Sequence, residues 1–213
     1  MRFVPSILLR PLRLVLLAAA VFLWCAGIGT AGPAGSVIGV SGTCMGESGG
    51  QRTPLTMGQS VQAGDIVDVS TGGKLKLRMV DGSVVSVASG TRLTISAYVV
   101  DAGGQRQSGK LDLAQGLVRA VVSPMGQPAT FEVDTAVGAA AARGTDWFVE
   151  VTRGAMQVGV LSGTVGMTSA ATGRSVTIPA RWGARLEAGR DPVPARVWSP
   201  AEFQAVIART DVP

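Results

Sequence analysis

The feature that most constrains the fold of this chain is a rhythm of short segments in which apolar and polar residues alternate. From residue 35 onward such segments recur about every ten residues, separated by Gly, Asp-Gly or Ser-Gly. Alternation with a period of two gives a β-strand one apolar face, and glycine-containing pairs accept the backbone angles of tight turns. The pattern predicts an all-β fold of many short strands, either a sandwich of the jelly-roll kind or a β-roll.

The segment around residues 74–79 shows this rhythm most clearly. Leu75, Leu77 and Met79 alternate with Lys74, Lys76 and Arg78. We expect the three apolar side chains to face the core and the three cations to face outward. Such a stripe could contact an anionic polymer, a membrane or a partner, but a solvated face or a protected edge strand is the favoured interpretation.

The C-terminal residues 191–213 follow a different pattern, which predicts a linker and a helix. An Asp-Pro-Val-Pro sequence starting at Asp191 indicates an extended linker. Ser199 and Glu202 form a capping box with proline at the first helical position. Apolar residues at i, i+3 and i+4 from Phe203 then predict one short helix that docks an apolar stripe.

Residues 1–31 have the pattern of a secretory signal peptide. Three arginines precede an uncharged apolar run, Leu14 to Ile28, which is too short to span a bilayer comfortably, and small residues follow at 29–31. A retained membrane anchor is the alternative. This segment holds three of the 19 basic residues and none of the 14 acidic ones, so the remainder carries about +2, which disfavours nucleic-acid binding. We expect a periplasmic or secreted protein that meets a membrane only through this segment.

The chain contains no histidine, which excludes Ser-His and Cys-His nucleophile pairs and histidine metal sites. The residues from Gly46 to Gly50 match the G-x-S-x-G pattern of a nucleophile elbow, but the chain has no histidine to act as its general base. A carboxylate pair for glycoside hydrolysis remains an alternative, although most acidic residues are expected at solvated turns. We therefore predict no enzyme, no cofactor and no metal site. Cys44, the one cysteine outside the signal peptide, is expected to be buried, with pairing between chains as the alternative.

The stretch from Val137 to Val151 holds an ambiguous motif, Arg143-Gly144-Thr145. Four alanines precede the motif and favour a helix, yet the residues after it alternate as a strand. Because no cap residue precedes the alanines, we interpret them as a close-packed strand that ends in a bend at Gly144. A buried Arg143 would need a carboxylate, so we interpret it as a clamp between strands, with a ligand or partner contact as the alternative. The candidate carboxylates are Asp81, Asp134 and Asp146.

Several of these motifs stand in the order found in one family. They are Gly64-Asp65 and Asp81-Gly82-Ser83 in 58–95, a Gly-x-Val-Arg strand ending at Arg119, Arg143-Gly144-Thr145 in 131–151, and a hairpin over 156–167. In this order and spacing the chain resembles the FecR-domain family over roughly residues 35–190. Members usually have Thr-Pro where this chain has Thr135-Ala136.

This resemblance implies a small exported β module that binds something in the cell envelope. The founding members are iron-transport regulators with a cytoplasmic anti-sigma segment, a transmembrane helix and a periplasmic sensing region. Because only a signal peptide precedes the domain, we expect a stand-alone exported FecR-domain protein without the anti-sigma segment. The expected parts are a signal peptide (1–31), a FecR-like β domain (35–190), and a linker with a C-terminal helix (191–213).

The function expected first is a non-enzymatic binding module of the periplasm or cell envelope, whose partner is an envelope protein or glycan. A regulator that transmits a signal through a separate membrane partner comes second, and a carbohydrate-active enzyme third. Tryptophan is common in interface hot spots, and Trp182 lies in a turn-rich stretch. The residues predicted as partner or ligand contacts are Lys74, Lys76, Arg78, Arg143 and Trp182.

Overall fold

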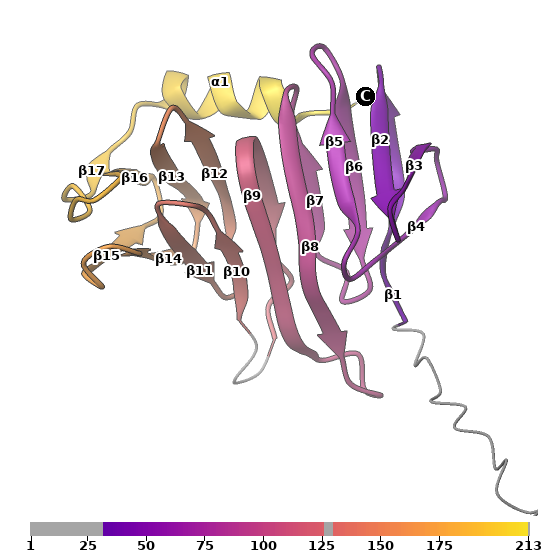
Figure 1. The fold of residues 1–213 in the computed structure, drawn as a ribbon. Helices are drawn as coiled ribbons and strands as arrows, with labels where there is room; N and C mark the ends of the chain where they lie inside the picture. Colours follow the sequence, from indigo (N-terminus) through magenta and orange to yellow (C-terminus); the bar gives the residue numbers. More distant parts are fainter. Residues whose placement is uncertain (1–31, 126–129, 213) are drawn as a thin grey trace, which may run out of the picture. The chain divides into compact units, whose positions relative to one another are not determined.

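The structure is a computed structural model that describes residues 32–125 and 130–212. The predicted signal peptide, residues 1–31, lies outside the described residues. Within the described part, the chain is mostly β-strand with a single α-helix near its C-terminus, which confirms the predicted fold class (Figure 1). That helix is too short and too polar to cross a membrane.

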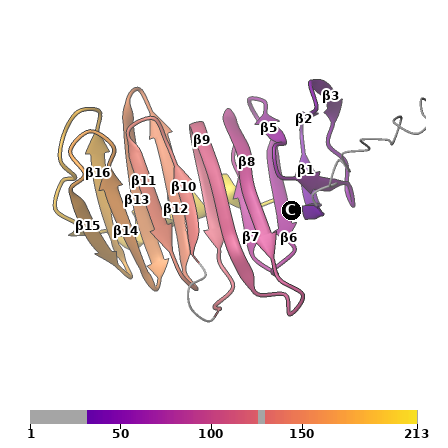
Figure 2. The same cartoon turned by 60° about the horizontal axis from the view of Figure 1, so that its bottom comes forward.

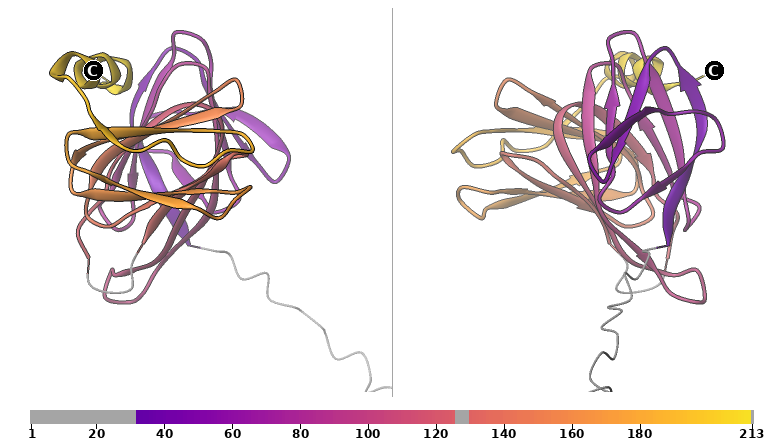
Figure 3. Two further views of the ribbon diagram at one scale, coloured as in Figure 1. Left: turned by 90° about the vertical axis from the view of Figure 1, so that its left-hand side faces the viewer. Right: turned by 45° about the vertical axis from the view of Figure 1, so that its right-hand side comes forward.

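The strands form two sheets that face each other as a sandwich (Figure 3). Sheet A contains, in order, β4 (Ser60–Gln62), β1 (Pro33–Ser41), β6 (Lys74–Met79), β7 (Val84–Val87), β9 (Arg106–Val121), β12 (Asp146–Thr152), β13 (Ala155–Ser162), β16 (Trp182–Glu187) and β17 (Arg196–Val197). Sheet B contains, in order, β3 (Gln51–Pro54), β2 (Cys44–Ser48), β5 (Ile66–Val69), β8 (Thr91–Val100), β9, β10 (Phe131–Asp134), β11 (Gly138–Ala142), β14 (Thr164–Ser169) and β15 (Ser175–Pro179). Neighbouring strands are antiparallel except β9 and β10, which are parallel.

Strand β9 belongs to both sheets. Its first part pairs with β8 and β10 in sheet B, and its second part pairs with β7 and β12 in sheet A. The change of sheet falls at Gly116, whose φ of 96° is disfavoured for other residues. A Cβ there would also lie 2.3 Å from Oγ1 of Thr91, so only glycine fits this bend.

The core between the sheets is built by the predicted alternation. Leu75, Leu77 and Met79 are buried, and so is Trp147. Cys44 is buried as a free thiol, which confirms the favoured interpretation. Burial raises the pKa of this thiol above its usual value.

The alanine run forms strand β11, as predicted. This strand lies between β10 and β14, with Ala140 and Ala142 in the core and Ala139 and Ala141 on the outer face of sheet B. Gly144 follows in a bend with a φ of 57°, where a Cβ would lie 3.0 Å from Cα of Pro124. Close packing against neighbouring strands and this bend therefore override the helix propensity of alanine.

The helix α1 (Pro200–Thr210) covers the outer face of sheet A, where Phe148, Trp198 and Val206 form a second apolar cluster. Two glycines leave room for its rings, because a Cβ at Gly159 would lie 2.4 Å from the Phe148 ring and one at Gly183 would lie 2.3 Å from the Trp198 ring. The predicted capping box at the start of α1 is confirmed. The ion pair with Arg196 and the backbone N–H of Ser199 lower the pKa of Glu202 to about 2.

Candidate functional site

The predicted cationic stripe of β6 faces outward, but two of its three members hold the C-terminal helix. The ammonium group of Lys74 donates to the carbonyl oxygens of Ala208, at 2.9 Å, and Asp211, at 2.8 Å. The Nζ of Lys76 lies 3.8 Å from a carboxylate oxygen of Asp211. Cations at a helix C-terminus are favoured by the partial negative charge of its unpaired carbonyl groups. Within this stripe, Arg78 is the exposed member, whereas Lys74 and Lys76 are half-buried.

Arg143 is exposed in the bend between β11 and β12, so the expectation that its side chain is buried is wrong. The three carboxylates considered for it form ion pairs with other cations: Asp81 with Arg106, Asp134 with Lys110, and Asp146 with Arg119. For Asp134 and Asp146 the reason is strand pairing, since Lys110 and Arg119 lie on β9, directly beside β10 and β12.

Arg119 is a clamp between strands. Its Nε and one terminal nitrogen donate to the two carboxylate oxygens of Asp146 at 2.9 and 2.8 Å, which ties β9 to β12. This hydrogen bonding raises the pKa of Arg119. The resemblance had matched Arg119 to a motif, but the sequence alone did not indicate its partner.

A second ion pair, between Arg106 and Asp81, lies entirely inside the protein. Asp81 also accepts hydrogen bonds from the backbone N–H of Ser83 and from its hydroxyl, both at 2.9 Å. Arg106 donates further to the carbonyl oxygen of Thr130 at 3.2 Å. The Asp-Gly-Ser motif is therefore a structural joint, and sequence reasoning missed Arg106 because polar neighbours on both sides suggested an exposed residue.

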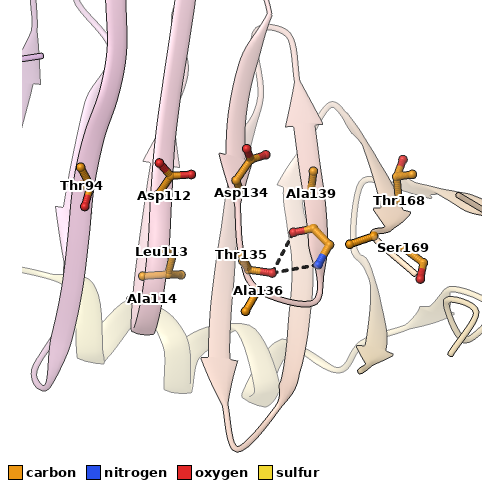
Figure 4. Close-up of a pocket in the computed structure, with 12 residues that line it drawn as sticks. Thr94, Asp112, Leu113, Ala114, Asp134, Thr135, Ala136, Ala139, Thr168 and Ser169 are labelled. Atoms are coloured by element: carbon orange, nitrogen blue, oxygen red, sulfur yellow. Dashed lines mark hydrogen bonds between the residues drawn. The ribbon is translucent and has the colours of Figure 1, made fainter. Parts of the chain in front are cut away.

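The candidate site is an open groove of about 470 Å³ on the outer face of sheet B (Figure 4). Its centre is a row of side chains that neighbouring strands bring into register: Thr94, Asp112, Asp134, Ala139 and Thr168. Residues paired in this way share one face of the sheet, so the row runs across β8, β9, β10, β11 and β14.

Small side chains make the floor of the groove, namely Ala114, Ala136 and Ala139. At its end, the hydroxyl of Thr135 donates to the carbonyl oxygen of Gly138 at 2.7 Å and accepts from the N–H of the same residue at 3.1 Å (Figure 4). These bonds hold the turn at which the resembling family usually has proline.

The groove is bordered by more negative than positive charge. Asp112 accepts a hydrogen bond from the hydroxyl of Ser96, and Asp134 forms an ion pair with Lys110. The nearby Glu132 shares Lys110 at 3.4 Å, and its hydrogen bond to Asp134 is the main cause that raises its pKa. Two carboxylates therefore share one ammonium group, Asp112 lies beside Asp134 in register, and an added cation would relieve the repulsion among them.

This arrangement supports non-covalent binding. Asp112 and Asp134 are direct neighbours across two strands, but each is bound by another side chain of the protein. In the described ranges, no three His, Cys, Asp or Glu side chains are grouped so that they could hold a metal ion. Sequence reasoning missed the groove, although the outward positions of Asp112 and Asp134 follow from alternation in their strands.

The remaining predicted contact, Trp182, lies at the start of β16 and is 36% exposed. It is not among the residues that line the groove. Its role as a partner contact stays a prediction.

Comparison with known proteins gives one family and several similar structures. The family model described as FecR protein matches residues 65–166. Two crystal structures, each described as "a putative anti-sigma factor" from Parabacteroides distasonis, are similar in fold at 16% sequence identity, with TM-scores of 0.53 and 0.54. The alignments cover 66% of this chain and 63% and 62% of those chains, so the chain spans less than two thirds of their length. No curated protein matches the sequence significantly.

Proposed function

Because this chain contains a FecR domain, we propose that it is a non-catalytic regulatory module that binds a partner protein and transmits a signal through it. The similar structures support this choice, since both are described as anti-sigma factors, a class of regulators. These comparisons favour a signalling role over the more general binding role that we expected first. The proposal places the protein in the cell envelope, because residues 1–31 have the charge and apolar pattern of an export signal.

The observation that carries the proposal is the difference between the two outer faces of the sandwich. On sheet A, the chain's own helix covers Phe148 and the neighbouring strands. On sheet B, the groove is open, and its floor consists of small side chains that allow a partner to approach closely. We assign to this groove an extended segment of the partner whose cationic side chain meets Asp112 and Asp134.

A groove-filling variant tests the proposal in cells. Ala139→Trp would place a large side chain over the floor, and Met57→Trp is the matched control at a site that is 65% exposed and outside the groove. Genome-wide transcripts are compared among the wild type, a deletion strain and strains that carry each variant. We expect Ala139→Trp to reproduce the deletion profile while Met57→Trp restores the wild-type profile, with equal amounts of both proteins.

Two outcomes would contradict the proposal. If the deletion leaves all transcripts unchanged, the protein does not regulate transcription. If the deletion changes them but Ala139→Trp behaves as wild type, the groove is not the site through which it acts. A photo-crosslinking residue at position 139 separates binding from signalling. A discrete crosslinked partner without a transcript change would support the general binding role that we expected first.

A further inference from the structure

Both sheets end on the same side of the sandwich, sheet B in β15 (Figures 1 and 2) and sheet A in β17 (Figure 1). Among the residues that the structure describes, β15 pairs with β14 alone. Pro179 has no N–H and cannot donate to β14, so it occupies a position whose backbone groups point away from that strand. Because these positions recur with a period of two, Ser175 and Thr177 also direct their N–H and C=O groups outward. No described residue uses them.

This edge carries a proline at its end, Pro179, but none of the charged side chains that normally protect an edge strand. Its residues Ser175–Pro179 include no charge, and Val176, Thr177 and Ile178 are β-branched. The other edge of sheet B differs, since β3 carries Arg52 in an ion pair with Asp68 at 3.0 Å. The contrast indicates that the β15 edge is kept suitable for pairing with another strand.

Exposed apolar side chains lie beside this edge. Trp182 pairs across β16 and β17 with Val197, which is 60% exposed. Val193 is 52% exposed just before β17, and Val176 is only partly buried against the core. The core is therefore incompletely covered at this end, and a tryptophan is available as an anchor.

The same end of the molecule carries excess positive charge. Its exposed arginines are Arg174, Arg181, Arg185, Arg190 and Arg196, against the carboxylates of Glu187, Asp191 and Glu202. Arg181 stands in the turn between β15 and β16, with a φ of 69° and no ion pair to any described carboxylate. Complementarity therefore favours an acidic partner.

We propose that the β15 edge surface, defined as β15 with Arg181, Trp182 and Val197, docks an extended strand of a partner protein that carries acidic side chains. The partner strand adds to sheet B through the outward backbone groups of Ser175 and Thr177, while its apolar side chains cover Val176 and Trp182. This surface lies outside residues 65–166, and none of its residues lines the groove, although Ser175 is hydrogen-bonded to the groove residue Thr168. The inference therefore does not depend on the proposed function.

Blocked peptides provide the probe. The first peptide alternates valine with glutamate, the second replaces each glutamate by lysine, and the third is the first with N-methyl groups on alternate residues. We expect the glutamate peptide to bind at least about tenfold more tightly than the lysine peptide, and the N-methylated peptide to lose binding because it cannot donate to the edge. Isothermal titration calorimetry with the full chain measures each Kd.

Variants of the protein locate the binding. Thr177→Pro removes an outward N–H without removing a bond to β14, and Arg181→Glu reverses a charge in a turn. Each should weaken binding of the glutamate peptide about tenfold, and Arg52→Pro, at an outward position of the opposite edge strand β3, should not. Arg181→Glu keeps the test valid if Thr177→Pro lowers the thermal stability.

Equal affinity for the glutamate and lysine peptides, no measurable binding, or indifference to both variants would overturn the proposal. A self-associating chain that Thr177→Pro converts to a monomer would also overturn it, because the edge would then belong to a second copy.

Discussion

The buried pair Asp81–Arg106 offers the sharpest test of the structure. Both side chains are fully buried, so Asp81→Ala leaves a guanidinium group inside the protein without its carboxylate. Removing one member of a buried pair typically costs about 3–5 kcal/mol. For a domain of this size, each kcal/mol shifts Tm by roughly 2–4 °C, so we expect a decrease on the order of 10 °C.

Thermal and urea denaturation followed by circular dichroism measure this loss. Two comparisons make the measurement specific. The double variant Asp81→Ala/Arg106→Met should recover part of the stability, because it removes the unpaired charge. Arg174→Ala should cost less than about 1 kcal/mol, because its pair with Asp191 is exposed. If Asp81→Ala costs no more than Arg174→Ala, the buried joint is not as described.

Three further predictions concern the helix and the thiol. Gly183→Val should displace Trp198, lower stability by about 1–3 kcal/mol and shift tryptophan fluorescence to the red, whereas Gly166→Ala, which meets no neighbouring atom, should be neutral. The ion pair with Arg196 lowers the pKa of Glu202 to about 2, so its contribution to folding stability is present above its unfolded pKa and is lost as the pH falls from about 4.5 to 2. Glu202→Gln should remove that part of the pH dependence of unfolding. An unchanged pH profile would contradict the ion pair. Burial raises the pKa of Cys44, so a thiol reagent at pH 8 should label it only after unfolding, and rapid labelling of the native protein would refute its burial.

The strands and the helix could be predicted because their signals are local. Alternation around Leu75 and Leu77 specifies a strand and its buried face whatever lies next to it. The capping box at Ser199 specifies where a helix begins through bonds within a few residues. Even the alanine run was interpretable, because its neighbours in the sequence are strands.

The sites could not be predicted in the same way, because they depend on which strands become neighbours. Chemistry alone allowed Arg143 to pair with any nearby aspartate, whereas strand register places Asp146 beside Arg119. The outward direction of Lys74 was predictable, but its contact with the end of α1 required the helix to cross sheet A. The groove likewise exists only because Asp112 and Asp134 meet in register.

Because both sheets share strand β9, this strand determines how the molecule unfolds. Since its first part is hydrogen-bonded in sheet B and its second part in sheet A, neither sheet can release its central strand without disturbing the other. Opening at the bend of Gly116 would remove the central members of both sheets at once. The amide hydrogens of β9 should therefore exchange with solvent only through global unfolding, and the two layers should melt as one cooperative unit.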